Sequence, residues 1–207
     1  MVVFAVVGHP NKGKSSLVTT LSENDRILVG AIPGTTKRAN RYDFSIDAEV
    51  LYSLVDTPGF QRAKAVLDWL EAHAKDASDR SNVVAQFVRL HEHDGRFYNE
   101  VELLRPIVAG AGILYVVDGA KPYGPEFEIE MQILRWTGNP RLALINLTAK
   151  GDYIGQWQSA LAQYFSIVRV FDARRAYFAS RLHLLSAFSE LNEAWRPFMS
   201  RAFDALV

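Results

Sequence analysis

The sequence predicts an α/β fold in which a mainly parallel β-sheet is flanked by helices. Short runs rich in β-branched and aromatic residues recur along the chain, as expected of strands that are buried on both faces. Stretches with the apolar spacing of an α-helix alternate with these runs, and this order is typical of right-handed crossovers between parallel strands. The chain has 207 residues, which suits one domain with a sizeable core.

The first predicted elements are a strand, a helix and two further strands. Val2–Val7 is a continuous apolar run that ends at a glycine, so it predicts a strand in the centre of the sheet. Lys14–Leu21 has helical spacing, and Tyr42–Ile46 and Val50–Val55 have the composition of strands. Turn-forming residues at 56–59 then end the second of these two strands.

The stretch from Gln61 to Val108 is longer than a single crossover helix needs. Apolar residues repeat there at helical spacing in three separate sets, which predict about two helices more than a minimal crossover. We interpret residues 61–108 as a helical insertion between the third and fourth strands. The sets are Ala63, Val66, Leu67 and Leu70; Val83, Val84, Phe87 and Val88; and Leu103, Leu104, Ile107 and Val108.

The remaining residues return to simple alternation of strands and helices. Strands are predicted at Ile113–Val117, Leu142–Ile145 and Ile167–Phe171, with helices at Glu126–Trp136 and Tyr153–Phe165 between them. A long C-terminal helix is predicted from about residue 174 to about residue 205. We interpret residues 1–207 as a single domain. Its apolar positions are Leu182, Leu185, Phe188, Leu191, Trp195 and Phe198.

The composition excludes several classes of function. Lys plus Arg and Asp plus Glu each number 23, so the net charge is zero and there is no strong nucleic-acid signature. Cysteine is absent, which excludes disulfides, thiolate zinc sites and cysteine nucleophiles. No apolar run reaches the roughly 18 to 20 residues of a transmembrane segment, and residues 1–7 leave no room for a secretory signal. We therefore expect a cytoplasmic protein, whose attachment to a membrane would need a region absent from this chain.

Residues 8–15 carry a motif that binds nucleotide phosphates. Gly8-His9-Pro10-Asn11-Lys12-Gly13-Lys14-Ser15 fits the pattern G-x-x-x-x-G-K-[ST] of a P-loop NTPase. Backbone N–H groups of such a loop surround the phosphates, its lysine reaches the β and γ phosphates, and its last hydroxyl binds Mg²⁺. The alternative, an accidental glycine turn, is disfavoured because a strand precedes the motif and a helix follows it. Nucleotide contacts are therefore expected from Gly8, His9, Pro10, Asn11, Lys12, Gly13, Lys14, Ser15 and Ser16.

Two further segments can contact the γ phosphate and its metal ion. Asp56 follows the strand Val50–Val55, where its carboxylate can hold Mg²⁺ through water, and the N–H of Gly59 can meet a γ phosphate. Thr36 lies in a polar segment before the second strand and can complete the Mg²⁺ shell when the γ phosphate is present. The alternatives are a simple Asp-initiated turn and an exposed Pro-Gly turn. With the phosphate loop upstream, we predict a metal site formed by Ser15, Thr36 and Asp56.

The order and spacing of these motifs resemble the G motifs of the translation-factor class of P-loop GTPases, and in particular of its Era and TrmE-like branch. This resemblance implies a G domain that binds GTP and hydrolyses it to GDP and phosphate as a slow, Mg²⁺-dependent molecular switch. A closer resemblance is to the N-terminal GTPase part of bacterial proteins that continue into a C-terminal domain of unknown function, which implies an excised domain. It is carried by Asp118, Glu130-Met131, Leu134-Arg135-Trp136-Thr137-Gly138, Pro140-Arg141 and Val168-Arg169-Val170-Phe171.

The resemblance also implies roles for individual residues. Lys14 and Ser15 resemble the phosphate-loop pair, Thr36 resembles the switch I threonine, and Asp56 with Gly59 resembles the start of switch II.

Two positions bear on catalysis. Asn11 resembles an asparagine that helps some members of the branch to bind K⁺, which makes stimulation by potassium a hypothesis. Phe60 stands where Ras-like enzymes have a glutamine that orients the attacking water, and we interpret it as a packing residue. The implied catalytic residues are Lys14, Thr36, Gly59 and Asn11.

The residues that should read the guanine base depart from the family pattern. The family has N-K-x-D after the fifth strand, whereas Asn146-Leu147-Thr148-Ala149 retains only the asparagine. Asp152 could replace the missing aspartate if the loop bends, but we prefer the interpretation that it caps a helix starting at Tyr153. Ala173 lies where the family's S-A-K motif would be, so its backbone N–H is expected to meet the base.

Two alternative functions therefore stay open. One is an NTPase or ATPase with weak base specificity, because the discriminating carboxylate is missing. The other is a nucleotide-binding interaction module without hydrolysis, with the helices of residues 61–108 as its partner surface. In either case the expected partner is an unidentified protein effector or a second copy of the chain.

Overall fold

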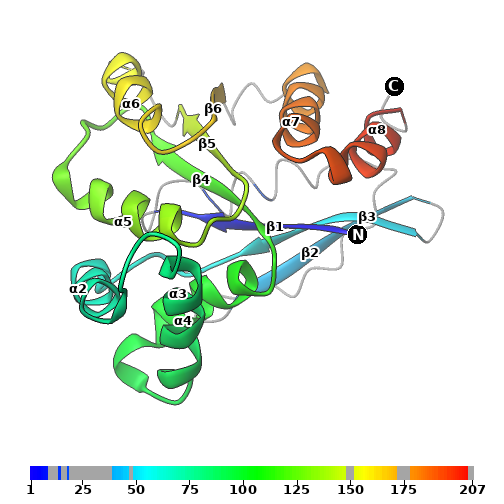
Figure 1. The fold of residues 1–207 in the computed structure, drawn as a ribbon. Helices are drawn as coiled ribbons and strands as arrows, with labels where there is room; N and C mark the ends of the chain where they lie inside the picture. Colours follow the sequence, from blue (N-terminus) through cyan, green and yellow to red (C-terminus); the bar gives the residue numbers. More distant parts are fainter. Residues whose placement is uncertain are drawn as a thin grey trace.

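The computed structural model contains a six-stranded sheet with the strand order β2-β3-β1-β4-β5-β6 (Figure 1). The structure describes residues 1–8, 14, 18, 39–46, 49–147, 152–171 and 178–204. β2 is antiparallel to β3, and every other neighbouring pair is parallel, which confirms the predicted α/β class. The strands are β1 Val2–Val7, β2 Asn40–Ile46, β3 Glu49–Asp56, β4 Gly112–Asp118, β5 Arg141–Asn146 and β6 Ile167–Phe171.

β1 lies in the middle of the sheet, between β3 and β4. The chain passes from β1 to β3 on one side and returns to place β4 on the other side. In open α/β sheets, such a reversal of strand order leaves a crevice at the carboxyl ends of the strands, where ligands bind. By this rule, the end of β1, where the phosphate-loop motif begins, is the expected position of a ligand.

The predicted helical insertion is present between β3 and β4. It consists of α2 (Ala63–His73), α3 (Arg80–Leu90), a 3₁₀ turn η1 (Gly95–Phe97) and α4 (Tyr98–Val108). Of the apolar positions that predicted these helices, all are buried or half-buried except Val108, which is exposed at the end of α4. The apolar spacing therefore identified the inward faces of all three helices.

The C-terminal region corrects one prediction. The single helix expected from about residue 174 to about residue 205 is instead α7 (Phe178–Leu191), a 3₁₀ turn η3 (Glu193–Trp195) and α8 (Arg196–Asp204). Asn192 breaks the helix because its backbone is extended, with φ −151° and ψ 125°, and its Oδ1 accepts a hydrogen bond from the N–H of Ala194 at 2.9 Å. Pro197 lies in the first turn of α8, where a proline needs no N–H partner.

Helices cover both faces of the sheet (Figure 1). α2, α3, α4 and α5 (Pro125–Trp136) pack with one face in a core that includes Ala5 and Val7 of β1. α7 and α8 pack with the other face in a second core that includes Phe4 and Val6. α6 (Ile154–Leu161) packs beside β5 and β6. Successive residues of β1 therefore enter opposite cores, as the strand pleat requires.

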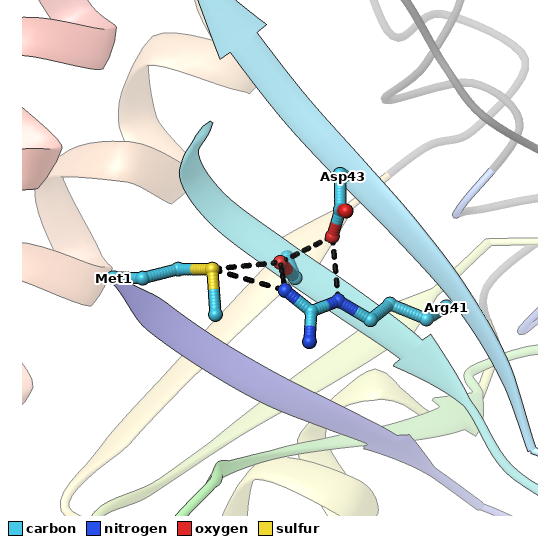
Figure 2. Close-up of polar contacts among 4 residues, drawn as sticks. Met1, Arg41 and Asp43 are labelled. Atoms are coloured by element: carbon cyan, nitrogen blue, oxygen red, sulfur yellow. Dashed lines mark hydrogen bonds and ion pairs between the residues drawn. The ribbon is translucent and has the colours of Figure 1, made fainter. Parts of the chain in front are cut away.

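A polar network joins the start of the chain to β2 and β3 (Figure 2). The Oγ of Ser53, which is fully buried, donates to Oδ1 of Asp43 at 2.6 Å and accepts from Nη2 of Arg41 at 3.0 Å. Arg41 also donates from Nε to Asp43 at 2.6 Å and from Nη2 to the sulfur of Met1 at 2.9 Å. The network ties three chain segments together away from the carboxyl ends of the strands.

Within the part of the chain that the structure describes, no helix combines the length and the apolar character that crossing a membrane requires.

Candidate functional site

The candidate site lies at the carboxyl edge of four neighbouring strands. Gly8 directly follows β1, Asp56 ends β3, Asp118 ends β4 and Asn146 ends β5. The strand register places Asp56 beside Val6 and Asp118 beside Asn146. The parallel pairing therefore brings residues that are up to 138 positions apart in the sequence to one edge of the sheet.

Gly8 occupies a position that excludes every other residue. Its φ is +155°, and a Cβ built on it would lie 2.2 Å from the carbonyl oxygen of Val116 in β4. That oxygen belongs to the backbone of a central strand and cannot move away. The first glycine of the motif therefore allows the chain to leave β1 in close contact with β4.

Lys14 is a buried cation at the mouth of this loop, with 8% of its surface exposed. Its Nζ donates a hydrogen bond to the carbonyl oxygen of Gly8 at 3.0 Å. Burial lowers the pKa of Lys14, while the negative charges of Asp56 and Glu130 oppose that change. Negative charge beside a buried ammonium stabilises its charged form, so an anion beside Nζ would be favourable. The phosphates of a nucleotide have the required charge.

The segment from Asp56 to Phe60 is firmly attached to the sheet. Asp56 is almost completely buried, and the hydroxyl of Thr57 donates to the carbonyl oxygen of Val6 at 2.8 Å. Gly59 is buried as well. Phe60 is 4% exposed and belongs to the core under the helical insertion, which confirms its interpretation as a packing residue. The aromatic ring cannot orient water from that position.

The structure adds Glu130, a buried carboxylate on α5 to which the sequence analysis gave no role in the site. Glu130 accepts a hydrogen bond from the hydroxyl of Tyr115 at 2.8 Å, and both residues are buried. Burial, together with the charge of Glu130, raises the pKa of Tyr115 well above its ordinary value, so the phenol stays protonated and donates. The sequence did carry a signal for Glu130: this carboxylate lies one helical turn from Phe127 and Leu134, on the apolar face of α5.

Asn146 is buried at the end of β5, and its Oδ1 has no hydrogen-bond partner among the described residues. A buried acceptor of this kind is uncommon in native structures, because an unmade hydrogen bond costs free energy. Its backbone carbonyl accepts from the N–H of Gly119 at 2.9 Å, which fixes the position of the residue. The side chain is therefore held in place with an acceptor that a ligand or a loop can satisfy.

Asp152 does not cap α6, so this expectation is wrong. α6 begins at Ile154, and Tyr153, its N-cap residue, makes no side-chain cap hydrogen bond. Asp152 is exposed. The N–H of Tyr153 instead donates to the carbonyl oxygen of Gly119 at 3.2 Å, and Gly119 is the residue that also holds Asn146. Tyr153, directly after Asp152, is thus attached to the edge of the sheet, because it is bonded to the residue that follows β4.

Several predicted site residues lie outside the described residues. Lys14 and Val18 are both helical, in agreement with the helix predicted at Lys14–Leu21. The residues whose roles stay predictions without a described position are His9, Pro10, Asn11, Lys12, Gly13, Ser15, Ser16, Thr36 and Ala173.

The chain is similar to known GTPases in sequence and fold. Residues 3–146 match the family described as 50S ribosome-binding GTPase. A segment of 118 residues is 36% identical to GTPase Der of Nitrosococcus oceani, covering 56% of this chain and 25% of that protein. A segment of 122 residues is 34% identical to GTPase Der of Latilactobacillus sakei subsp. sakei, covering 56% of this chain and 28% of that protein. These matches span only about a quarter of the relatives' length.

The fold is also similar to a solved structure. A variant of Era from Aquifex aeolicus, bound to GDP and AlF4⁻, superposes with a TM-score of 0.58 at 19% sequence identity, over 92% of this chain and 57% of that one.

Proposed function

The chain belongs to the family of 50S ribosome-binding GTPases, and from this premise we propose that it is a slow molecular switch that hydrolyses GTP to GDP and phosphate. A P-loop GTPase fold, the binding of GTP and its hydrolysis are properties of the family to which it belongs. The observation that carries the proposal for this chain is the buried Lys14 ammonium, which donates to the carbonyl of Gly8 and is influenced by the charge of Asp56.

The phosphate loop would bind the β and γ phosphates. Lys14 would exchange its hydrogen bond with Gly8 for phosphate oxygens, which regain the electrostatic stabilisation that burial removed. The other loop contacts are proposed for His9 to Gly13, Ser15 and Ser16. Gly59, which follows the anchored Thr57, would present its N–H to the γ phosphate.

A Mg²⁺ ion fits the donors of this site. Asp56 supplies a buried carboxylate near Lys14, and Ser15 and Thr36 supply hydroxyls, which matches the preference of Mg²⁺ for oxygen ligands with few protein carboxylates. When bound, the ion would neutralise charge on the phosphates. We also propose that Asn11 helps to bind K⁺.

Hydrolysis should be slow without a partner. Phe60 is buried in the core at the position of the water-orienting glutamine, and no other side chain at the described edge of the sheet replaces it. A protein effector or a second copy of the chain would supply the missing group.

Guanine recognition is proposed for Asn146, Asp152 and the N–H of Ala173. The partnerless Oδ1 of Asn146 and the exposed carboxylate of Asp152 support this assignment, because the same residue, Gly119, holds both segments at the edge of the sheet. The competing proposal is an NTPase with weak base specificity, which the departure from N-K-x-D favours.

We further propose that residues 1–207 are one G domain of the Era and TrmE-like branch, from a protein that continues into a further domain. The sequence motifs support the branch, and the partial coverage of the relatives is compatible with a multidomain protein.

Parallel titrations with fluorescent GDP and ADP, with Mg²⁺ present and KCl as the salt, test the proposal. A large preference for GDP supports the GTPase assignment. Comparable affinities would favour the general NTPase, and binding of neither nucleotide would contradict both. Multiple-turnover phosphate release from GTP, compared in KCl and NaCl, tests hydrolysis and the role of potassium. Equal rates in the two salts, unchanged by Asn11→Ala, would remove the K⁺ proposal.

A further inference from the structure

The start of α2 lacks a cap of its own. Its N-cap residue, Arg62, makes no side-chain cap hydrogen bond, and the first turn of the helix contains no acidic residue. Backbone N–H groups at the start of a helix need acceptors, and negative charge is favourable there because of the helix dipole. Only Gln61 and Arg62 separate the first residue of α2 from Phe60. The start of the helix is therefore close in sequence to Gly59, which is proposed to contact the γ phosphate.

Glu100 of α4 supplies the missing acceptor. Its Oε1 accepts hydrogen bonds from the N–H of Gln61 at 2.8 Å and from the N–H of Arg62 at 2.6 Å. Glu100 is 1% exposed, so these bonds form out of contact with water and are assisted by the charge of the carboxylate. Glu100 also lies in the first turn of α4, where its charge is favourable for that helix as well.

These contacts leave little freedom to the segment between β3 and α2. Thr57 is bonded to Val6 at one end, Glu100 holds Gln61 and Arg62 at the other end, and Phe60 is packed in the core between them. Gly59 therefore lies between two attachments that the protein itself provides. A segment that is already ordered does not have to be ordered by the γ phosphate when it binds.

α4 also contacts the segment on the other side of the site. Oε2 of Glu102 accepts a hydrogen bond from the N–H of Ala39 at 3.4 Å, and Ala39 immediately precedes β2, shortly after Thr36 in the sequence. One helix of the insertion thus contacts the chain beside both proposed switch segments.

We propose that Glu100 is a positioning residue. Through it, the helical insertion holds the proposed switch II segment, which starts at Asp56 and includes Gly59, in the conformation that accepts a γ phosphate. The proposal rests on the proposed GTPase function. It gives the insertion a role in nucleotide discrimination: Glu100 should favour GTP over GDP, because only GTP contacts the segment that Glu100 holds.

Substitution of Glu100 by alanine tests this role. Affinities for GDP and for a non-hydrolysable GTP analogue are measured for the wild type, for Glu100→Ala and for Glu92→Ala. Glu92 is the matched control, since it is an exposed glutamate of the same insertion that forms an ion pair with Arg105. We expect Glu100→Ala to weaken binding of the GTP analogue roughly tenfold, the effect of losing charged hydrogen bonds, and to leave GDP binding unchanged. Glu92→Ala should change neither affinity.

Each other result overturns the inference. Equal losses for both nucleotides would make Glu100 a general structural residue, unchanged affinities would remove its role, and a gain for the GTP analogue would mean that it opposes the γ phosphate. Failure of the wild type to bind the analogue would instead contradict the proposed function, so the two failures are distinguishable.

Hydrogen exchange of the wild type gives a test that needs no variant to fold. We expect the amides of Gln61 and Arg62 to be protected without nucleotide, with GDP and with the GTP analogue. Protection that appears only with the analogue would show that the nucleotide itself orders the segment, against the proposal. Glu100→Gln, which retains an acceptor oxygen of the same reach, should keep more of the preference for the GTP analogue than Glu100→Ala does.

Discussion

At the scale of single residues, the candidate site depends on groups that have no alternative position or no alternative partner. Gly8 is the only residue that fits against the carbonyl oxygen of Val116. Lys14 is a buried cation, and Asn146 presents an acceptor that no described residue satisfies. A buried charge and a buried acceptor without a partner each cost free energy, and such costs are typical of binding sites.

Gly8→Ala should abolish tight nucleotide binding and destabilise the protein. The new Cβ would lie 2.2 Å from Val116 O, so β1 or β4 must shift and the phosphate loop moves with β1. We expect a loss of at least about tenfold in GDP affinity and a cost of about 2 kcal/mol or more in unfolding free energy, measured by titration and urea denaturation. Gly155→Ala is the control, because its Cβ would meet no atom within 4 Å and alanine favours the helix α6. A Gly8→Ala protein that binds GDP normally would contradict the geometry.

If Asp152 binds the guanine base, Asp152→Ala should lower the affinity for GDP but not the affinity for ADP. A carboxylate that accepts hydrogen bonds from guanine contributes about 1.5 to 3 kcal/mol, so GDP affinity should fall by about ten- to a hundredfold while ADP affinity stays constant. Glu71→Ala removes an exposed carboxylate of α2 and should leave both affinities unchanged. Equal GDP affinity in the wild type and in Asp152→Ala would show that Asp152 does not recognise the base and would leave Asn146 and Ala173 as the residues proposed to do so.

At the scale of elements, two helical regions cover the two faces of the sheet. The insertion of α2, α3 and α4 covers the face on which Phe60 is buried, and α4 contacts the chain beside both proposed switch segments. The break at Asn192 turns the chain so that η3 and α8 return over the other face. There the ring of Trp195 packs edge-on against Phe4, with ring centroids 5.1 Å apart, and covers Gly112 of β4.

Trp195→Ala should therefore destabilise the protein without changing its nucleotide preference. The indole fills the space above Gly112, where even one added carbon would lie 2.5 Å from the ring, so its removal leaves a cavity beside β1 and β4. Because Trp195 is only half-buried, we expect the variant to lose about 2 to 3 kcal/mol of unfolding free energy in urea denaturation, which is below the range for fully buried aromatic residues. Leu90→Ala, at a side chain that is 63% exposed, should cost less than about 0.5 kcal/mol. Similar costs for the two variants would mean that η3 does not stabilise the sheet.

An aromatic cluster that includes His91 joins the end of α3 to the short helix η1. His91 follows α3 and is half-buried against Phe87 and Phe97, with ring centroids 4.4 Å and 4.9 Å apart. Its Nδ1 lies 2.9 Å from the carbonyl oxygen of Phe87. The end of α3 is thus an aromatic contact between the helices of the insertion.

At the scale of the whole molecule, a central sheet separates two cores, and the candidate site lies along one edge of this sheet. The parallel strands place the candidate site at their carboxyl ends, while the network of Met1, Arg41, Asp43 and Ser53 ties the chain together elsewhere (Figure 2). The polar network and the candidate binding site therefore lie in different regions of the same sheet.

This network predicts a dependence of stability on pH. Burial alone would raise the pKa of Asp43, but hydrogen bonds from Ser53 and Arg41 lower it below its ordinary value of 3.8. A carboxylate whose pKa is lower in the folded state contributes stability above its unfolded pKa and loses it as the pH falls through the folded value. Asp43 should therefore contribute fully at neutral pH and progressively less below about pH 4. The effect is small, because its side chain is 40% exposed and screened by water.

Urea denaturation at neutral pH and at about pH 3 tests this contribution. Asp43→Asn should be less stable than the wild type at neutral pH, and the difference between the two proteins should narrow at the lower pH. Glu71→Gln, at an exposed carboxylate of α2 that makes no hydrogen bond with the described residues, should show no such narrowing. A constant difference for Asp43→Asn would exclude the ionic contribution.

Most of the fold could be predicted from the sequence. All six strands, the central position of β1 and the helical insertion after β3 follow from local spacing, because apolar periodicity records which face of an element is buried. Apolar spacing does not show where a helix is interrupted when apolar residues continue at similar intervals on both sides of the break, so the break at Asn192 was missed. The phosphate-loop motif was recognisable because its residues are contiguous and because a strand precedes it.

By itself, the sequence determined the α/β class and the order of the strands, and it predicted the phosphate-loop motif, since each of these depends on residues that are neighbours in the chain. Only the tertiary structure decided which distant groups meet: Gly8 against Val116, Glu130 with Tyr115 near Lys14, and Glu100 on the N–H groups of Gln61 and Arg62. The physical reason is that local periodicity identifies a buried face but not its partner. A carboxylate on an apolar face is costly until a donor from another element reaches it, and only the packed fold shows that donor.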